Sequence, residues 1–282
     1  MSGLLQFVIR LGVDAETRFT SVERIHKYID TLKPEKDTIG PDVPIVDRPD
    51  LTEWPTRGRI SFREVTMRYR PGLPLALKDV TFDISPQEKI GIVGRTGAGK
   101  SSITSVLFRL VEVNSGSVHI DGIDISKVPL NELRSRISII PQDPNLFRGS
   151  IRKNLDPFND FKIQSLMEAL ECVQLKQKVN NLKNGINNSV NESGASFSAG
   201  ERQLLCMARA LLRKSKILIL DEPTSHMDGE TQTIIQNTVM NAFKDCTVIT
   251  IAHRLQTIIN CHRVMVMSDG KVSYFHSIET NF

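Results

Sequence analysis

The residues best suited to chemistry form one glycine-rich run, Gly94-Arg95-Thr96-Gly97-Ala98-Gly99-Lys100-Ser101. It fits the pattern G-x-x-x-x-G-K-[ST], in which glycines let backbone N–H groups approach phosphate oxygens and the lysine places a cation on the β- and γ-phosphates. The serine hydroxyl of this pattern is a ligand of Mg²⁺. The sequence therefore predicts a nucleotide-binding site made by this run and the next residue, Ser102.

An acidic pair, Asp221-Glu222, follows the apolar run Ile217–Leu220. A carboxylate at the end of a buried strand can reach the Mg²⁺ of such a site, and the next one can polarise an attacking water. A solvated acidic pair at a strand end is the plainer alternative. Together with the glycine-rich run, the pair predicts that ATP and Mg²⁺ bind here, with Asp221 as a metal ligand and Glu222 as the base.

Apolar strands and amphipathic helices alternate around these residues. Lys89–Val93 precedes the glycine-rich run, and Val248–Ala252 is a third buried strand. Continuous apolar strands separated by helices are typical of a parallel sheet covered on both faces. After the run, one helix face should carry Ile103, Val106, Leu107 and Leu110. The stretch 150–213 is expected to be largely helical and broken by the Asn-rich stretch 180–192.

The chain divides into three regions by composition. Residues 1–32 have apolar residues at helical spacing, residues 33–57 are proline-studded and predict an extended linker, and residues 58–282 carry the motifs. A net charge of +4 from 36 basic and 32 acidic residues gives no sign of nucleic-acid binding. The four cysteines form no C-x-x-C pair, and no apolar run reaches the roughly 20 residues that cross a bilayer.

Further motifs resemble those of ATP-binding-cassette proteins. Phe197-Ser198-Ala199-Gly200-Glu201-Arg202-Gln203 resembles their L-S-G-G-Q signature. Four single residues match other motifs of the family. Tyr69 matches the aromatic residue that stacks on adenine, Gln142 the Q-loop, Asp228 the D-loop and His253 the switch histidine. The resemblance implies a P-loop NTPase core of α/β class with a mixed or parallel sheet, an antiparallel β subdomain and a helical signature subdomain. It also implies that Gln142 is a metal ligand with a catalytic role, and that His253 is catalytic.

Longer stretches are similar to the second nucleotide-binding domain of the C subfamily, the multidrug-resistance-associated exporters. They are 18–24 (RFTSVER), 54–55 (WP), 91–97 (GIVGRTG), 154–158 (NLDPF) and 200–206 (GERQLLC). By this resemblance the region 1–32 is the cytosolic end of the last transmembrane helix, and the chain ends early, as a truncated or alternatively ended product.

The resemblance also implies partners. Two such cassettes pair head to tail, so that Ser198, Ala199, Gly200 and Glu201 would meet ATP held by the partner. Transmembrane domains would complete an exporter, and the chain would be membrane-associated at the cytoplasmic face. Because Glu222 is a good base, the competent site would be the one built on this chain's own Lys100. No nucleic-acid partner is expected.

Several residues depart from the family pattern. Phe197, Ala199 and Glu201 stand where the common signature has Leu, Gly and Gln, and His226 replaces a small residue. Two alternatives stay open: a non-catalytic or vestigial nucleotide-binding fragment, and a soluble cassette ATPase of DNA repair or translation. The second alternative lacks support, because no long coiled-coil insertion lies between the glycine-rich run and the signature. The guanine motif N-K-x-D and the kinase motif H-R-D do not occur.

Overall fold

The computed structural model divides into two units, residues 1–37 and 38–282. The residues that the structure describes are 2–32, 35, 51–190, 197–221, 229–252, 258 and 260–277.

The first unit is a single helix, α1 (Ser2–Thr31). Its apolar side chains, among them Phe7 and Ile29, are more than half exposed. Some of its threonine hydroxyls donate to backbone carbonyls about one turn earlier in the helix, as Thr17 does to Val13 at 2.8 Å. Among the described residues, no helix combines the length and the apolar composition that a membrane span requires.

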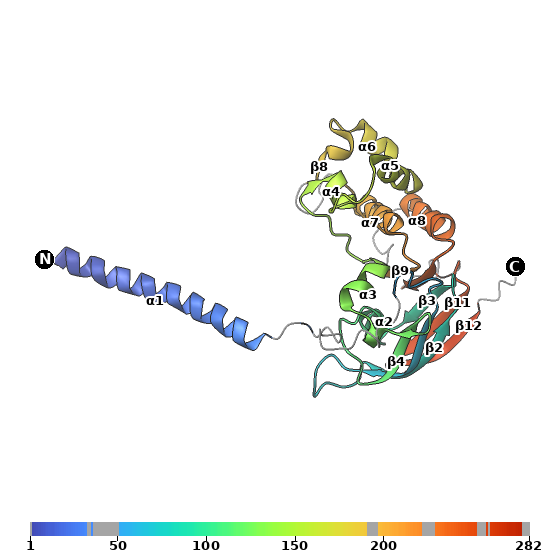
Figure 1. The fold of residues 1–282 in the computed structure, drawn as a ribbon, viewed down its shortest axis with the longest axis horizontal. Helices are drawn as coiled ribbons and strands as arrows, with labels where there is room; N and C mark the ends of the chain where they lie inside the picture. Colours follow the sequence, from blue (N-terminus) through green and yellow to red (C-terminus); the bar gives the residue numbers. More distant parts are fainter. Residues whose placement is uncertain are drawn as a thin grey trace. The chain divides into compact units, whose positions relative to one another are not determined.

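A six-stranded mixed sheet forms the centre of the second unit (Figure 1). Its strands, in spatial order, are β12 (Lys271–Ser277), β11 (Arg263–Ser268), β3 (Lys89–Gly94), β10 (Thr247–Ile251), β9 (Ile217–Asp221) and β6 (Ile137–Ile140). The pairings from β11 to β6 are parallel, and only β12 runs antiparallel to its neighbour. The three apolar runs predicted as neighbouring buried strands are confirmed as β3, β10 and β9.

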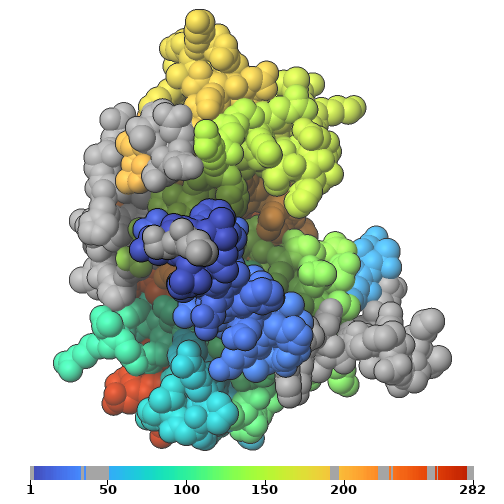
Figure 2. All heavy atoms as spheres, turned by 90° about the vertical axis from the view of Figure 1, so that its left-hand side faces the viewer, coloured from blue at the N-terminus to red at the C-terminus, as the bar shows by residue number. Residues whose placement is uncertain are grey.

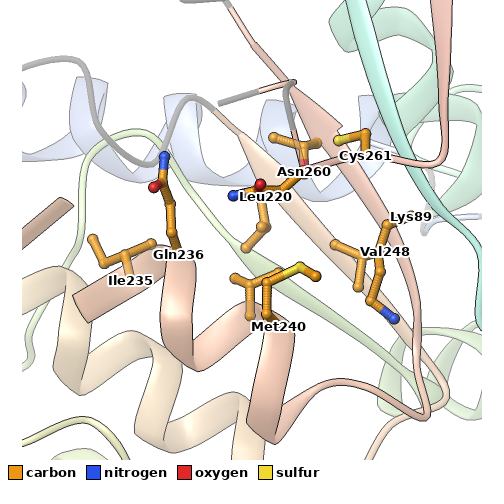
Figure 3. A pocket seen from close by; sticks show the side chains of 10 residues that line it. Lys89, Leu220, Ile235, Gln236, Met240, Val248, Asn260 and Cys261 are labelled. Carbon is orange, nitrogen blue, oxygen red and sulfur yellow. The ribbon is translucent and has the colours of Figure 1, made fainter. Parts of the chain in front are cut away.

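Successive residues of the central strands face opposite sides of this sheet. Ile219 and Ile249 pack with α2 (Lys100–Leu107), whereas Leu220 and Val248 belong to a second core with helices α7 (Ala199–Arg213) and α8 (Gly229–Ala242). Figure 3 shows this second side, where Leu220 and Val248 face residues of α8 across a small apolar pocket. Both faces of the sheet are therefore covered, which explains why the strands read as continuous apolar runs.

An antiparallel sheet packs against the α2 side. In spatial order it contains β2 (Leu77–Ile84), β1 (Ile60–Met67), β4 (Ser115–Ile120) and β5 (Ile123–Asp124). Phe62 and Phe82 lie opposite each other in the register, and their rings stack with centroids 4.5 Å apart. Both belong to the same core as Ile219 and Ile249, so the two sheets share one hydrophobic interior.

Most of the other elements that the structure describes in this unit are helices. They are α3 (Leu130–Arg136), α4 (Ile151–Leu155), α5 (Ile163–Cys172), α6 (Lys176–Asn181), α7 (Ala199–Arg213) and α8 (Gly229–Ala242). Short 3-10 turns lie at Ile125–Lys127 and Gly185–Asn187. Two short strands, β7 (Gly149–Ser150) and β8 (Ser189–Val190), form an antiparallel pair. In Figure 1 helices α4 to α7 lie together at one end and the sheets at the other. Figure 2 shows the same division, with the yellow residues of α6 at the top and the cyan residues between β1 and β2 at the bottom. The predicted α/β architecture with three subdomains is confirmed.

Two local expectations need correction. α2 ends at Leu107, and Leu110 is 62% exposed instead of lying on the helix's buried face. The chain turns at Arg109, whose backbone is left-handed and whose guanidinium is buried against the carbonyls of Ile125 and Val128. Within the stretch expected to be linker, the Trp54 ring is 4% exposed and donates to the Ile120 carbonyl at 2.9 Å, so this end is packed into the core.

Candidate nucleotide-binding site

A hollow of about 330 Å³ opens at the carboxyl end of β3. Segments far apart in the sequence line it: the loop between β1 and β2, the start of α2, the residue after Pro141, and the ends of β9 and β10. The hollow brings together nine of the residues predicted from sequence, namely Tyr69, Thr96, Gly97, Gly99, Lys100, Ser101, Ser102, Gln142 and Asp221. Its volume is in the usual range for a small-molecule site.

The backbone of the glycine-rich run is shaped by close approach to a neighbouring loop. Gly99 has φ +100, and a Cβ atom there would lie 2.9 Å from the Ala76 carbonyl oxygen. A second contact holds the glycine-rich run in place, because the Gly270 N–H donates to the Ala98 carbonyl at 3.1 Å. α2 starts at the next residue without a side-chain cap, so its first backbone N–H groups remain available at the positive end of the helix. This geometry suits an anion.

Lys100 is held inside this turn. It is 6% exposed, and its Nζ donates to the carbonyls of Gly94 at 2.8 Å and Arg95 at 3.2 Å. Burial lowers the pKa of Lys100, and the charge of Asp221 partly opposes that shift. A buried ammonium whose partners are neutral carbonyls is attracted to any anionic group that enters the hollow.

Oxygen-bearing side chains also line the hollow. Ser101 and Gln142 are exposed, and Asp221 is half-buried at the end of β9. Mg²⁺ prefers such hard oxygen ligands and takes the remainder from waters and phosphates. Among the described residues there is no cluster of three His, Cys, Asp or Glu side chains that would hold a metal without a phosphate. The residues present therefore fit Mg²⁺ that arrives with a nucleotide.

Tyr69 lies at the edge of the hollow, about half exposed. Its hydroxyl shares a hydrogen bond of 2.9 Å with the Ser102 Oγ atom. Ala76, which also lines the hollow, lies in the same β1–β2 loop as Tyr69. The aromatic ring is thus placed beside the first turn of α2, where a base attached to bound phosphates could stack on it.

The signature residues begin another helix, α7. Ser198 is its N-cap: the Ser198 Oγ accepts from the Glu201 N–H at 3.2 Å, and Glu201 Oε2 accepts from the Ser198 N–H at 2.8 Å. Lys178 of α6 donates to Glu201 Oε1 at 2.5 Å. Burial alone raises the pKa of Glu201, but the hydrogen bonds from Lys178 and Ser198 outweigh it and lower the pKa overall.

The next residues fix α7 against the rest of the unit. Gly200 is buried against α8, where an added Cβ would lie 2.6 Å from the Thr231 methyl group. Ala199 is half-buried. Gln203 is completely buried, and its Nε2 donates to the Pro141 carbonyl at 3.1 Å. Because Pro141 precedes Gln142, this bond joins the signature helix directly to the segment that lines the hollow.

Some predicted residues lie outside the part of the chain that the structure describes: Glu222, His226, Asp228 and His253. Of the other predicted nucleotide-binding residues, Gly94 ends β3, and Arg95 and Ala98 lie in the turn between β3 and α2. Sequence reasoning missed Ala76 and Ile251, which line the hollow, and Lys178. Ile251 could have been found, since it ends an apolar strand and pairs in register with Asp221.

A phosphate cradle between a parallel strand and a helix, with an acidic residue at the end of the strand two places along, defines a P-loop nucleotide-binding domain. The family model described as "ABC transporter" matches residues 77–225, more than half of the chain. The chain belongs to the ABC transporter family, and within it to the nucleotide-binding domains of the C subfamily.

Relatives and a solved structure agree with this assignment. The chain is 48% identical over 268 residues to human ATP-binding cassette sub-family C member 2, covering 95% of this chain and 17% of that protein. It is 47% identical over 274 residues to the metal resistance protein YCF1 of Saccharomyces cerevisiae, covering 97% and 18%. The structure of a bacterial Atm1-family ABC exporter with ATP bound superposes with a TM-score of 0.80 at 28% identity, covering 93% of this chain and 44% of that chain. The chain thus spans less than a fifth of the length of these two relatives.

Proposed function

We propose that this chain binds ATP with Mg²⁺ in the hollow beside β3 and hydrolyses it to drive export of a substrate across a membrane. The observation that carries the proposal is that four separately predicted features converge on one hollow: the glycine-rich run, Tyr69, Gln142 and Asp221. Their chemistry is complementary to a nucleoside triphosphate: an aromatic edge, a cradle of backbone N–H groups, a buried ammonium and oxygen ligands for a divalent cation.

The proposed roles combine the positions of the described side chains with the sequence motifs and the family resemblance, which assign Glu222 and His253. Lys100 turns from the Gly94 and Arg95 carbonyls to the β- and γ-phosphates, while Tyr69 packs on the base. Ser101, Gln142 and Asp221 would hold Mg²⁺, and the ion would screen the charge on the transferred phosphoryl group. Glu222, adjacent in sequence to Asp221, orients and deprotonates the attacking water, and His253 contacts the γ-phosphate.

The signature residues act on a second nucleotide. In the proposed assembly, a second cassette pairs head to tail with this chain, so that Ser198 and its neighbours contact the ATP of that partner. The similarity of the longer motifs to second nucleotide-binding domains supports this place in an exporter. Transmembrane domains would be the other partners, with residues 1–32 leading out of the last membrane helix and residues 33–57 joining that helix to the cassette at the cytoplasmic face.

Replacing the base separates binding from hydrolysis. In Glu222→Gln, the affinity for MgATP should persist while turnover falls by a factor of roughly 10²–10³, the scale for losing a transition-state contact. Steady-state phosphate release and equilibrium nucleotide titration measure the two quantities. If the wild-type chain binds ATP and releases no phosphate, either alone or with a first nucleotide-binding domain of the subfamily, it is a non-catalytic binding domain and the proposal fails.

A further inference from the structure

Lys178 makes an unusual set of contacts at the start of the signature helix. Besides its 2.5 Å bond to Glu201, its ammonium lies 5.3 Å from the centre of the Phe197 ring. Phe197 is buried and immediately precedes the N-cap, and its carbonyl accepts from Arg202 at 3.0 Å. One side chain of α6 therefore contacts residues on both sides of the N-cap of α7.

The bonding at Glu201 depends on its being a carboxylate. One carboxylate oxygen of Glu201 accepts a hydrogen bond from the Ser198 N–H, and the other accepts one from the Lys178 ammonium, so both oxygens serve as acceptors. Glutamine at this position could still accept from the Ser198 N–H, but its amide group would then present N–H donors to the Lys178 ammonium. The lysine and the glutamate thus form a matched pair.

The pair has an electrostatic consequence for the helix end. A glutamate in the first turn normally stabilises a helix, but an uncompensated negative charge there opposes an approaching phosphate. Lys178 cancels that charge while leaving the carboxylate in the capping arrangement. The pair itself is partly exposed, with 41% of the lysine and 24% of the glutamate side chain accessible, so its effect on overall stability should be small.

We infer that Lys178 is a positioning residue of the signature: it locks Glu201 into the cap and neutralises it, so that the start of α7 can receive the phosphates of a partner's ATP despite the acidic residue in its first turn. This inference rests on the proposed function, because it assigns the site to ATP bound by a second cassette. It also explains how Glu201 can stand where the common signature has glutamine.

The test uses the full chain with MgATP and compares Lys178→Met, Lys178→Arg, Glu201→Gln and the double variant Lys178→Met/Glu201→Gln. Lys176→Met is the matched control, because Lys176 lies on the same helix, is 37% exposed and makes a 2.7 Å ion pair with Glu171 away from the signature. Hydrolysis is measured against chain concentration, since in this assay a second copy of the chain provides the paired cassette. The affinity of each variant's own cradle is measured by titration with a fluorescent ATP analogue.

Lys178→Met should lower maximal turnover roughly tenfold, the scale of one hydrogen bond to a charged group, and leave cradle affinity within about twofold. Lys178→Arg and the double variant should recover most of the turnover, and Lys176→Met should match the wild type. A purely structural ion pair would leave the turnover of the folded protein unchanged in Lys178→Met. Equal turnover in Lys178→Met and Lys176→Met would overturn the inference.

A second readout needs no nucleotide. Amide hydrogen exchange at Glu201 and Arg202 should accelerate in Lys178→Met and stay unchanged in Lys176→Met, because only the first change loosens the cap. If the wild type binds but does not hydrolyse ATP, the proposed function fails, and this exchange measurement still decides the inference. Unchanged exchange in Lys178→Met contradicts it.

Discussion

The two helices that begin at the proposed ATP contacts start in opposite ways. α2 begins after a left-handed glycine and has no side-chain cap, and the lysine of its first turn folds back on backbone carbonyls. α7 begins with a full capping box, to which a lysine from another helix adds a third bond. One start is held in place by the surrounding backbone, and the other by its own side chains.

The difference suggests how each helix end is used. At α2 the N–H groups of Lys100 and Ser101 are left for a ligand, whereas those of Ser102 and Ile103 donate to the Gly99 carbonyl. Steric contact between loops maintains the turn. At α7 the cap is completed before any partner arrives, so that pairing with a second cassette need not order it. The following predictions test whether backbone packing and side-chain capping are indeed the separate supports of the two ends.

Gly99→Ala should have the largest effect, because it attacks the backbone support of α2. Its Cβ would be 2.9 Å from the Ala76 carbonyl and the backbone would keep a left-handed φ. We expect the free energy of unfolding to fall by about 2–4 kcal/mol, from strain and overpacking together. Urea denaturation without nucleotide measures this loss.

Gly97→Ala is the matched control for that change. Gly97 has a similar φ of +82, but an added Cβ would meet nothing within 4 Å. Only the conformational penalty of about 1–2 kcal/mol should remain. Equal losses in the two variants would show that contact with the Ala76 loop does not support the cradle.

Ser198→Ala should have an intermediate effect, because it removes the cap of α7. We expect a loss of about 1 kcal/mol in the free energy of unfolding. Ser150→Ala provides the comparison, since Ser150 caps α4 by accepting from the Lys153 N–H at 3.1 Å. Both changes should cost similar stability, whereas hydrolysis should fall only in Ser198→Ala. A parallel loss of hydrolysis in Ser150→Ala would mean that stability, and not the signature contact, controls turnover.

Lowering the pH should have the smallest effect. Of the two helix starts it should weaken only that of α7, because α2 has no acidic residue in its first turn. The pKa of Glu201 is lowered in the folded chain, so its contribution is present above the unfolded value of 4.5 and is lost as pH falls through the folded pKa. The difference in unfolding free energy between wild type and Glu201→Gln should therefore be present at pH 7 and shrink below about pH 4.5. A difference that stays constant down to pH 3 would exclude the ionised carboxylate as the cap's acceptor.

Sequence patterns predicted those parts of the fold whose causes are local. The strand–cradle–helix unit was evident because β3, the glycine-rich run and α2 are contiguous, and the apolar strands β9 and β10 because both sheet faces are covered. The helical stretch 150–213 was expected from its own sequence pattern, whereas the antiparallel subdomain followed only from the family resemblance. Leu110 was misplaced because the chain turns at Arg109, whose side chain finds its carbonyl partners 16 and 19 residues further on.

Contacts between distant segments were not predictable in this way. Trp54 looked like part of a linker because its partner, the Ile120 carbonyl, is 66 residues away. Lys178 could not be singled out from the sequence, because Glu201 lies 23 residues further along and the helices must pack before the two meet. Ala76 was missed for the same reason, since its role is to lie against Gly99 from another loop.

The most direct test of the account is a calorimetric titration of MgATP into the wild type, Lys100→Met and Lys89→Met. Lys89 is an exacting control, because it is also 6% exposed and its Nζ also donates to two carbonyls, those of Gln87 and Lys244, but it lies at the other end of β3. We expect the affinity to fall roughly 100-fold in Lys100→Met, the upper range for losing a hydrogen bond to a charged group, and to persist in folded Lys89→Met. Equal affinity in all three proteins would contradict the assignment of the glycine-rich turn as the phosphate site.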